Sequence, residues 1–222
     1  FNIEKETNQK IIQTIIDELK LSINSGKYDH FIKIDITDFY PSIRHDILLK
    51  KIRKKIRKKT ILDLIEKALI TPTIPVPSRN NQPNKKGIPQ GIAIANILAN
   101  IYLSDIDNKY SQNIEIKYFR YVDDILILCK KDNAREVRDD FIKSLQVLSL
   151  EISQNKYKSG DIREGFSYLG YSYKKIQSHY GFSVRDESIK KFEESIIKIF
   201  SEYKFNNKTK TEKFIWKLNK KI

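Results

Sequence analysis

Three aspartates occupy positions where acidic residues are uncommon. Asp35 lies within the alternating run FIKIDITDF, and Asp123 and Asp124 are adjacent between two apolar runs. Aspartate is disfavoured in strands, and neighbouring carboxylates repel each other. Taken singly, Asp35 fits a solvent-facing strand position, and the Asp123-Asp124 pair fits ordinary turn chemistry. Held together on rigid strands, the three could bind two divalent cations that activate a hydroxyl and neutralise a leaving pyrophosphate.

Magnesium is the cation that such a set of ligands suits. It takes hard oxygen ligands and keeps waters and substrate phosphates in its coordination shell, so three protein carboxylates suffice. The sequence therefore predicts two Mg²⁺ ions as cofactors, with Mn²⁺ as an alternative.

The residues around these acids predict the strands that carry them. The isoleucines of FIKIDITDF alternate with polar residues, which predicts a half-buried strand around Asp35. The runs 114–121 and 124–130 are separated only by Val122 and Asp123, which predicts a tight hairpin.

The remaining elements follow from helical and alternating patterns. Residues 91–109 predict a buried helix whose apolar stripe is formed by Ile94, Ile97, Leu98 and Ile101. The other predicted elements are helices at 9–23, 42–59, 60–70, 133–150 and from 186 to the end, a loop at 153–161, and hairpin strands at 166–175 and 179–184. This order predicts an α+β fold with a largely antiparallel sheet backed by helices.

Composition bounds the class of protein. The chain has 222 residues, 11% of them aromatic, which is enough for one core with a small appended lobe and excludes a disordered chain. No apolar run approaches the roughly 18 residues of a membrane span, and no signal peptide is present, so we expect no membrane partner and a cytoplasmic location. A single cysteine, Cys129, fits a reducing compartment.

The net charge of +14 favours a nucleic-acid partner, although biased codon use explains part of the lysine excess. The chain contains no methionine, even at position 1. We therefore expect the sequence to be an excerpt of a longer gene product.

Four stretches in order, FIKIDITDFYPSI, KKGIPQGIAIANILANIYL, YFRYVDDILIL and FSYLGYSY, resemble the palm motifs of reverse transcriptases. The similarity spans about residues 30–173, and the combination is specific even though YxDD alone is weak. It implies a polymerase palm followed by a small helical, thumb-like segment. By this resemblance Asp35, Asp123 and Asp124 are catalytic metal ligands, and the backbone carbonyl of Ile36 is a further ligand.

The resemblance also assigns substrate-binding residues. Phe39 and Tyr40 follow the strand of Asp35, and the family uses an aromatic residue at Tyr40 as a steric gate that rejects a ribose 2′-hydroxyl. A core tyrosine at a strand end explains Tyr40 equally well. Gln90 and Gly91 belong to a loop that contacts the nucleotide, for which a tight turn before a helix is the alternative. The family usually has Ser at the position of Ala95, often followed by Pro where Asn96 stands.

Lys156 aligns with a family lysine that donates a proton near the pyrophosphate, although a solvated loop lysine fits as well. Four residues resemble the primer grip, for which a hydrophobic strand is an equal explanation: Phe166, Leu169, Gly170 and Tyr171. The run KKIRKKIRKK at 50–59 is either a solvated helix face or a surface for phosphate contacts, through Lys54, Lys55, Arg57 and Lys58.

The expected organisation is a helix leading into the palm at 1–29, the palm at 30–184 and the start of a thumb at 185–222. The expected enzyme is a nucleotidyltransferase of the bacterial retron, group II intron or phage-defence type, with phage defence as the first expectation. RNA template, DNA primer and product, and dNTPs are the expected partners, with a structured non-coding RNA or a partner protein as further ones. Two alternatives stay open: a template-independent or protein-primed polymerase, and a non-catalytic nucleic-acid-binding scaffold.

Overall fold

The computed structural model describes residues 2–72, 83–89, 91–201, 214–216 and 218, with side chains from residue 8 onward. The chain divides into two compact units, Phe1–Ile162 and Arg163–Ile222, and each is described by itself. The expected functional division at 29/30 and 184/185 stays a prediction. None of the helices within the described ranges is long and apolar enough to cross a membrane.

The first unit alternates helices with four strands. In chain order its elements are α1 (Asn2–Asn24), β1 (His30–Asp35), α2 (Phe39–Ser42), α3 (His45–Arg53), α4 (Lys59–Ile70), α5 (Ala95–Ser111), β2 (Lys117–Tyr121), β3 (Asp124–Cys129), the 3-10 helix η1 (Lys131–Asn133), α6 (Ala134–Val147) and β4 (Lys158–Asp161). The α+β class predicted from the sequence is confirmed.

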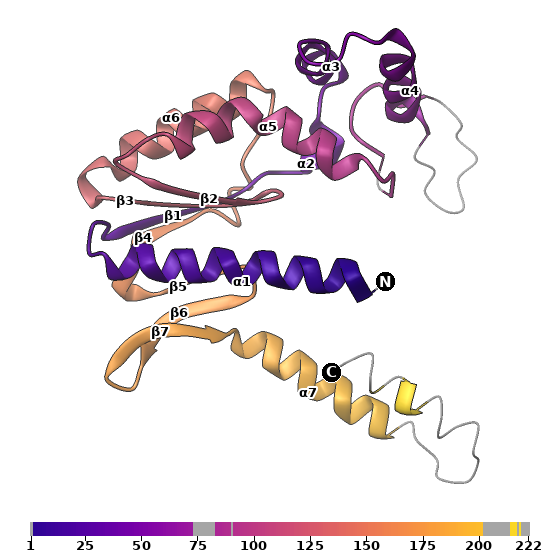
Figure 1. Ribbon diagram of the computed structural model, residues 1–222. Coiled ribbons are helices and arrows are strands. Elements are labelled where there is room, and N and C mark those ends of the chain that lie inside the picture. Colours follow the sequence, from indigo (N-terminus) through magenta and orange to yellow (C-terminus); the bar gives the residue numbers. More distant parts are fainter. Residues whose placement is uncertain (1, 73–82, 90, 202–213, 217, 219–222) are drawn as a thin grey trace. The chain divides into compact units, whose positions relative to one another are not determined.

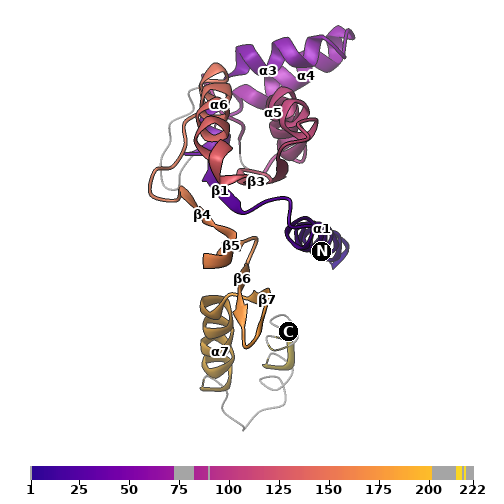
Figure 2. The ribbon, with the colours of Figure 1, turned by 90° about the vertical axis from the view of Figure 1, so that its left-hand side faces the viewer.

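The four strands form one antiparallel sheet in the order β2-β3-β1-β4. Helices α5 and α6 cover one face of this sheet, and α1 lies on the other (Figures 1 and 2). An ion pair between Lys117 of β2 and Glu18 ties α1 to the sheet edge. The two central strands, β1 and β3, are the ones that end at the acids.

Alternation in β1 sorts its side chains as predicted. Ile32 and Ile34 are fully buried and belong to the core cluster that also contains Leu98 of α5 and Phe141 of α6. Asp35 lies on the opposite face and is half-buried. The core therefore anchors the strand from one side and leaves the other side to its polar residues.

The predicted hairpin is confirmed, with β2 ending at Tyr121 and β3 beginning at Asp124. Its two turn residues are Val122 and Asp123, and Val122 has a φ of 57°. β-Branched residues rarely adopt this region, because their Cβ substituents clash with the backbone. The turn that presents the paired acids is thus strained.

Two predictions about the helices were wrong. The segment 42–59 is not one helix, because α3 ends at Arg53 and α4 begins only at Lys59, so the basic run spans a helix end, a turn and a helix start. Six cationic side chains within 50–55 and 57–59 repel one another, which disfavours a continuous helix. Ile97 is not part of the buried stripe of α5, since its side chain is 60% exposed.

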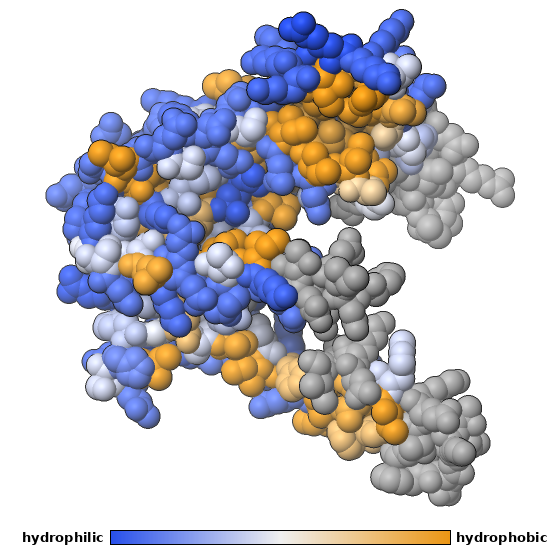
Figure 3. Space-filling model, in the orientation of Figure 1, coloured by the Kyte–Doolittle hydropathy of each residue, from blue (hydrophilic) through white to orange (hydrophobic). Residues whose placement is uncertain are grey.

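The apolar surface of the first unit gathers where α3, α4 and α5 meet (Figure 3). Ile97 contributes from α5, and Ile61, Leu64 and Ile70 of α4 are also exposed. The helix period alone could not separate the buried from the exposed isoleucines of α5, because apolar residues occur around most of its circumference.

Part of the predicted loop 153–161 is a strand. Residues Lys158–Asp161 form β4, which pairs with β1 from His30 to Lys33. The sequence KSGD lacks the β-branched and aromatic residues that mark a strand, so the partner strand decides its conformation.

The second unit contains a three-stranded antiparallel sheet in the order β5-β6-β7, followed by a helix. Its elements are β5 (Phe166–Tyr168), β6 (Tyr171–Ile176), β7 (His179–Val184) and α7 (Asp186–Ser201), and the 3-10 helix η2 (Ile162–Glu164) lies at the boundary between the units. The predicted strands and the helix from residue 186 are thereby observed up to Ser201; the expected helical continuation to residue 222 falls largely outside the described residues.

The contact of Phe141 with the core yields a stability prediction. Its fully buried ring packs edge-on against Tyr110, with 4.8 Å between ring centroids. Phe141→Ala should lower the free energy of unfolding by about 3–5 kcal/mol, because it removes a large apolar side chain and leaves a cavity. Val147→Ala on the same helix is the control, since Val147 is 78% exposed and should change stability by less than about 0.5 kcal/mol. Equal losses in urea unfolding would contradict this packing.

Candidate active site

The antiparallel register of β1 and β3 places two carboxylates opposite each other. Asp35 pairs with Asp124 at the last position of the ladder, where β1 ends and β3 begins. Asp123 precedes Asp124 in the hairpin turn, so all three acids gather at one end of the sheet. The side chains of Asp35 and Asp124 are only 17% and 25% exposed, so their mutual repulsion is incompletely screened by water.

Two lysines offset this repulsion. Lys156 Nζ lies 2.9 Å and 3.1 Å from the two carboxylate oxygens of Asp35 and donates to both. Lys33 Nζ lies 3.4 Å from Asp124 Oδ1. Burial raises the pKa of the Asp124 carboxyl; Lys33 opposes this, and the charges of Asp35 and Asp123 add to it. The hydrogen bond to Asp35 raises the pKa of the Lys156 ammonium group.

The donors at this end of the sheet have the chemistry that hard divalent cations require. Carboxylate oxygens and a backbone carbonyl are ligands that Mg²⁺ and Mn²⁺ accept. In the described part of the chain, however, no three His, Cys, Asp or Glu side chains converge closely enough to hold an ion. Asp35 is directed to an ammonium group instead, so cation binding requires this carboxylate to exchange its lysine partner for the ion.

A pocket of about 350 Å³ opens beside the acids. Asp35 and Asp123 line it together with Lys156, and the segment 36–41 supplies most of the remaining wall. Predicted residues that come together here are Asp35, Ile36, Phe39, Tyr40, Asp123 and Lys156. Phe39 differs from the others because its side chain is 3% exposed and belongs to the core cluster.

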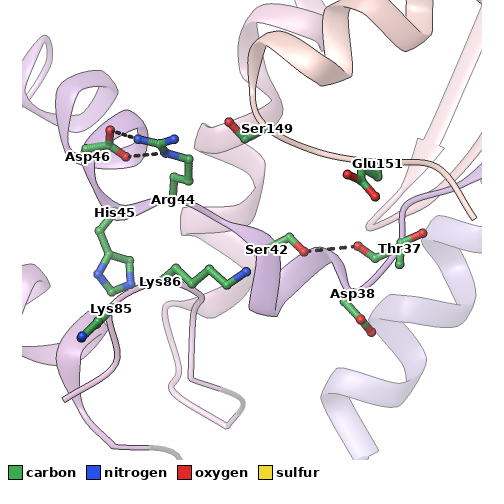
Figure 4. Close-up of a pocket in the computed structure, with 10 residues that line it drawn as sticks. All are labelled: Thr37, Asp38, Ser42, Arg44, His45, Asp46, Lys85, Lys86, Ser149 and Glu151. Carbon is green, nitrogen blue, oxygen red and sulfur yellow. Dashed lines mark hydrogen bonds and ion pairs between the residues drawn. The ribbon is translucent and has the colours of Figure 1, made fainter. Parts of the chain in front are cut away.

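A larger pocket, of about 840 Å³, shares Thr37 and Asp38 with the first one. Figure 4 shows His45, Lys85 and Lys86 on one side and Asp38 with Glu151 on the other. Arg44 is held by a two-pronged contact with Asp46, and His45 Nε2 donates to the carbonyl of Gly87 at 2.7 Å. His45 thereby fixes the loop that precedes α5 against α3.

The Tyr40 ring reaches from α2 to α5. Its hydroxyl donates to Asn96 Oδ1 at 2.6 Å, and its backbone carbonyl accepts from the N–H of Ile88 at 2.9 Å. Burial raises the pKa of the Tyr40 phenol, and the negative charge of Asp123 raises it further. The phenol therefore keeps its proton at neutral pH and acts as a donor.

Arg120 supports the hairpin that carries Asp123 and Asp124. Its side chain is 11% exposed and donates to both oxygens of Asp107 on α5, at 2.7 Å and 2.6 Å. It also donates to the carbonyl of Val122 at 2.9 Å and to Asn100 Oδ1 at 3.2 Å. The strained turn is thus tied through one guanidinium to the helix beneath it.

The remaining predicted site residues lie elsewhere or are not described. Gln90 lies outside the described residues, and Gly91 has a φ of 92° that favours glycine. The four residues of the basic run, Lys54, Lys55, Arg57 and Lys58, are exposed between α3 and α4. The expected primer-grip residues lie in the second unit, on β5, on β6 and in the turn between them: Phe166, Leu169, Gly170 and Tyr171.

Sequence reasoning missed the supporting residues Lys33, Arg120 and Asp107. A signal for Arg120 exists, because it is a charged residue within the otherwise apolar and aromatic run YFRY. Charged side chains at half-buried strand positions need a partner, and Asp107 on the preceding helix is a candidate within reach. Nothing in the sequence distinguishes Asp107 from the neighbouring Asp105 as that partner.

The Arg120 contacts yield a prediction about stability. Arg120→Ala should lower the free energy of unfolding by about 3 kcal/mol, because removing one partner of a partly buried pair leaves the Asp107 carboxylate poorly compensated. The matched control is Arg53→Ala, which breaks an exposed pair with Glu66 and should cost at most about 1 kcal/mol. Chemical denaturation of both variants measures the difference, and a loss no greater than that of Arg53→Ala would contradict the supporting role.

The sequence matches the family described as Reverse transcriptase (RNA-dependent DNA polymerase) over residues 3–173. Among curated proteins, it is 37% identical over 84 residues to a COX1/OXI3 intron 2 protein of Saccharomyces cerevisiae, covering 37% of this chain and 10% of that protein. It is 23% identical over 185 residues to protein YkfC of Escherichia coli, covering 68% of this chain and 48% of that protein. The chain thus spans about half or less of the length of these relatives.

Solved structures with the same fold include telomerases. Apo telomerase from Candida tropicalis, truncated from its C-terminal domain, aligns with a TM-score of 0.60 at 17% identity, covering 79% of this chain and 40% of that chain. Telomerase from Candida albicans, in complex with a fragment of telomeric RNA, aligns with a TM-score of 0.59 at 13% identity, covering 79% and 34%. Because the family match covers most of the sequence, this chain belongs to the reverse transcriptase (RNA-dependent DNA polymerase) family.

Proposed function

We propose that this chain carries the catalytic site of an RNA-directed DNA polymerase that adds dNMP to a primer 3′-hydroxyl. The observation that supports this most directly is the pairing of Asp35 with Asp124, with Asp123 adjacent in the turn. Both Asp35 and Asp123 line the same pocket as Tyr40, so the acids adjoin a space that could receive a nucleotide. Membership of the reverse transcriptase family supports the same reaction.

In this proposal Asp35, Asp123, Asp124 and the carbonyl oxygen of Ile36 are the groups that would hold two divalent cations. Such cations, Mg²⁺ or alternatively Mn²⁺, lower the pKa of an attacking hydroxyl and neutralise a leaving pyrophosphate when bound. The sheet fixes the two opposed carboxylates by backbone hydrogen bonds, so they are positioned before substrate arrives.

Lys156 has the proton and the position for general acid catalysis. Its raised pKa keeps the ammonium group protonated at neutral pH, and its side chain is 65% exposed beside the acids. Donation of this proton to the leaving pyrophosphate would reduce the negative charge that develops there. Lys156 also neutralises Asp35 before substrate binds.

Tyr40 is proposed to select the sugar. Its half-buried ring lines the pocket beside Asp35 and Asp123. A rigid ring at this wall leaves no space for a ribose 2′-hydroxyl and gives it no hydrogen-bond partner, which favours dNTPs over NTPs. Gln90 and Gly91 are proposed to contact the nucleotide from the loop before α5.

The proposed nucleic-acid partners are an RNA template and a DNA primer. The net charge of +14 and the exposed basic run between α3 and α4 support a polyanionic partner. The Candida albicans telomerase of the same fold is solved with RNA, which is consistent with such a partner. The hairpin 166–171 is proposed as a primer grip, and a structured RNA or a partner protein as a further ligand of the whole enzyme.

The biological setting is a separate proposal. A role in phage defence rests on the sequence similarity of SIRHDIL and ANILANIYLSDID to bacterial reverse transcriptases of that type. Plaque counts on a host expressing the full-length gene, compared with a strain expressing the Asp123→Asn/Asp124→Asn form, test it. Equal plaque counts would contradict the defence role without affecting the polymerase proposal.

Removal of the paired acids tests the proposed catalysis. In full-length protein with a primed RNA template, labelled dNTPs and Mg²⁺, Asp123→Asn/Asp124→Asn should lower incorporation at least about 1,000-fold, roughly 4 kcal/mol of transition-state stabilisation. EDTA should abolish wild-type incorporation, and Mn²⁺ should restore it. The control Asp132→Asn removes an exposed carboxylate just after β3 and should leave the rate unchanged.

The outcomes of this assay separate the alternatives. Incorporation that survives the double substitution would contradict the metal-ligand assignment, and incorporation without a template would indicate a template-independent polymerase. Binding of primed RNA without any incorporation would favour the non-catalytic scaffold.

The basic run between α3 and α4 is expected to contact phosphates. Replacing its four exposed residues with glutamine should weaken binding of an RNA–DNA duplex and flatten the dependence of log Kd on log salt by up to about 0.9 per lost contact. Fluorescence anisotropy at several salt concentrations measures this slope. The residues replaced are Lys54, Lys55, Arg57 and Lys58.

A charge-matched variant provides the control. It replaces four exposed lysines on α1, η1 and α6 and alters the net charge by about the same amount: Lys10, Lys20, Lys131 and Lys143. If both variants change the salt dependence equally, the run acts only through net charge and the proposed contact is wrong.

A further inference from the structure

The contact between Tyr40 and Asn96 joins two parts of the fold that are 56 residues apart in sequence. The Tyr40 hydroxyl donates to Asn96 Oδ1 at 2.6 Å. Tyr40 lies on the short helix α2 that follows β1, and Asn96 is the second residue of α5. The bond therefore fixes the outer end of a ring that lines the pocket of Asp35 and Asp123.

Both ends of this bond stand on fixed backbone. The carbonyl of Tyr40 accepts from Ile88, and the preceding Phe39 is buried in the core with its ring centroid 5.5 Å from that of Tyr40. Asn96 is flanked by the buried Ala95 and lies two residues before the buried Leu98. The remaining freedom is rotation of the two side chains, and the hydrogen bond between them removes most of it.

The bond also commits the single proton of the phenol. A tyrosine hydroxyl has one O–H donor, and here that donor is directed to the Asn96 side-chain oxygen. A ribose 2′-hydroxyl that approached the ring would then receive no hydrogen bond from it. Without Asn96, the ring could turn away from the pocket or offer its proton to the 2′-hydroxyl, and either change favours ribonucleotides.

We propose that Asn96 is a positioning residue that holds the Tyr40 ring against the nucleotide pocket and thereby sets the preference for dNTPs over NTPs. This inference rests on the proposed polymerase function. Asn96 itself is exposed, and its substitution should leave the fold intact, since its neighbours in α5 carry the core contacts.

The test is single-nucleotide incorporation by the full-length protein on a primed RNA template, with kcat/KM measured for a dNTP and for the matching NTP. Asn96→Ala should lower the dNTP-to-NTP ratio of kcat/KM about fivefold, the loss of one neutral hydrogen bond of about 1 kcal/mol. Asn96→Asp keeps an acceptor for the phenol and should retain most of the ratio. Asn108→Ala, at an exposed position on the same helix, should leave it unchanged.

Coupling between the two residues separates positioning from a general structural effect. Tyr40→Phe removes only the hydroxyl and should lower the ratio by the same factor. The double variant Tyr40→Phe/Asn96→Ala should lower it no further than either single variant, because both remove one interaction. Melting temperatures close to that of the wild type in all variants would show that the change in ratio is not a loss of fold.

The results also separate this inference from the function on which it rests. A wild-type enzyme that incorporates neither dNTPs nor NTPs overturns the proposed function and the inference together. Normal wild-type dNTP incorporation with an unchanged ratio in Asn96→Ala, or additive effects in the double variant, overturns the role of Asn96 alone.

Discussion

The antiparallel register between β1 and β3 is the constraint on which the site depends. Six residue pairs, from His30↔Cys129 to Asp35↔Asp124, fix which side chains face each other. Like charges directly opposite each other across an antiparallel pair are destabilising, so the final pair opposes folding. Burial of the isoleucines on the other face holds the register despite that repulsion, because a slip of one residue would expose them.

The two lysines show how the molecule tolerates these carboxylates in the absence of a cation. Lys33 comes from the same strand as Asp35, two residues earlier, and approaches Asp124 on the neighbouring strand. Lys156 comes from the segment before β4 and contacts Asp35. Both positive charges lie where the proposed reaction needs positive charge, so cation binding exchanges one form of neutralisation for another.

Helix α5 acts as a common support for the two halves of the proposed site. Its buried face packs into the core through residues such as Leu98 and Tyr102. Its polar side chains reach outward, Asn96 to Tyr40, and Asn100 and Asp107 to Arg120. The wall that contacts the sugar and the hairpin that carries the paired acids are therefore positioned from one element.

Much of this arrangement was predictable from local pattern. The strand of Asp35, the hairpin turn at Val122 and Asp123, and the convergence of Tyr40 and Lys156 on the acids follow from alternation, turn length and the family motifs. The strand β4 did not, because its residues have weak strand propensity and pair only through tertiary context. The break in the basic run and the exposure of Ile97 depend on charge repulsion and on helix packing, which hydrophobic periodicity does not report.

Side-chain partners were the least predictable feature. The Arg120–Asp107 pair and the Tyr40–Asn96 bond join residues through orientations that only the folded backbone defines. Their consequence is nevertheless local and chemical: one guanidinium holds a strained turn, and one amide holds a ring.

The central claim is that the register of β1 and β3 builds a site for divalent cations. A crystal structure of the full-length protein with Mn²⁺, with the ion located by its anomalous scattering, tests it most directly. The account predicts Mn²⁺ at about 2.1–2.2 Å from carboxylate oxygens of both Asp35 and Asp124, with the Lys156 ammonium group displaced from Asp35. Mn²⁺ bound elsewhere, with the Lys156–Asp35 pair intact, would contradict the account.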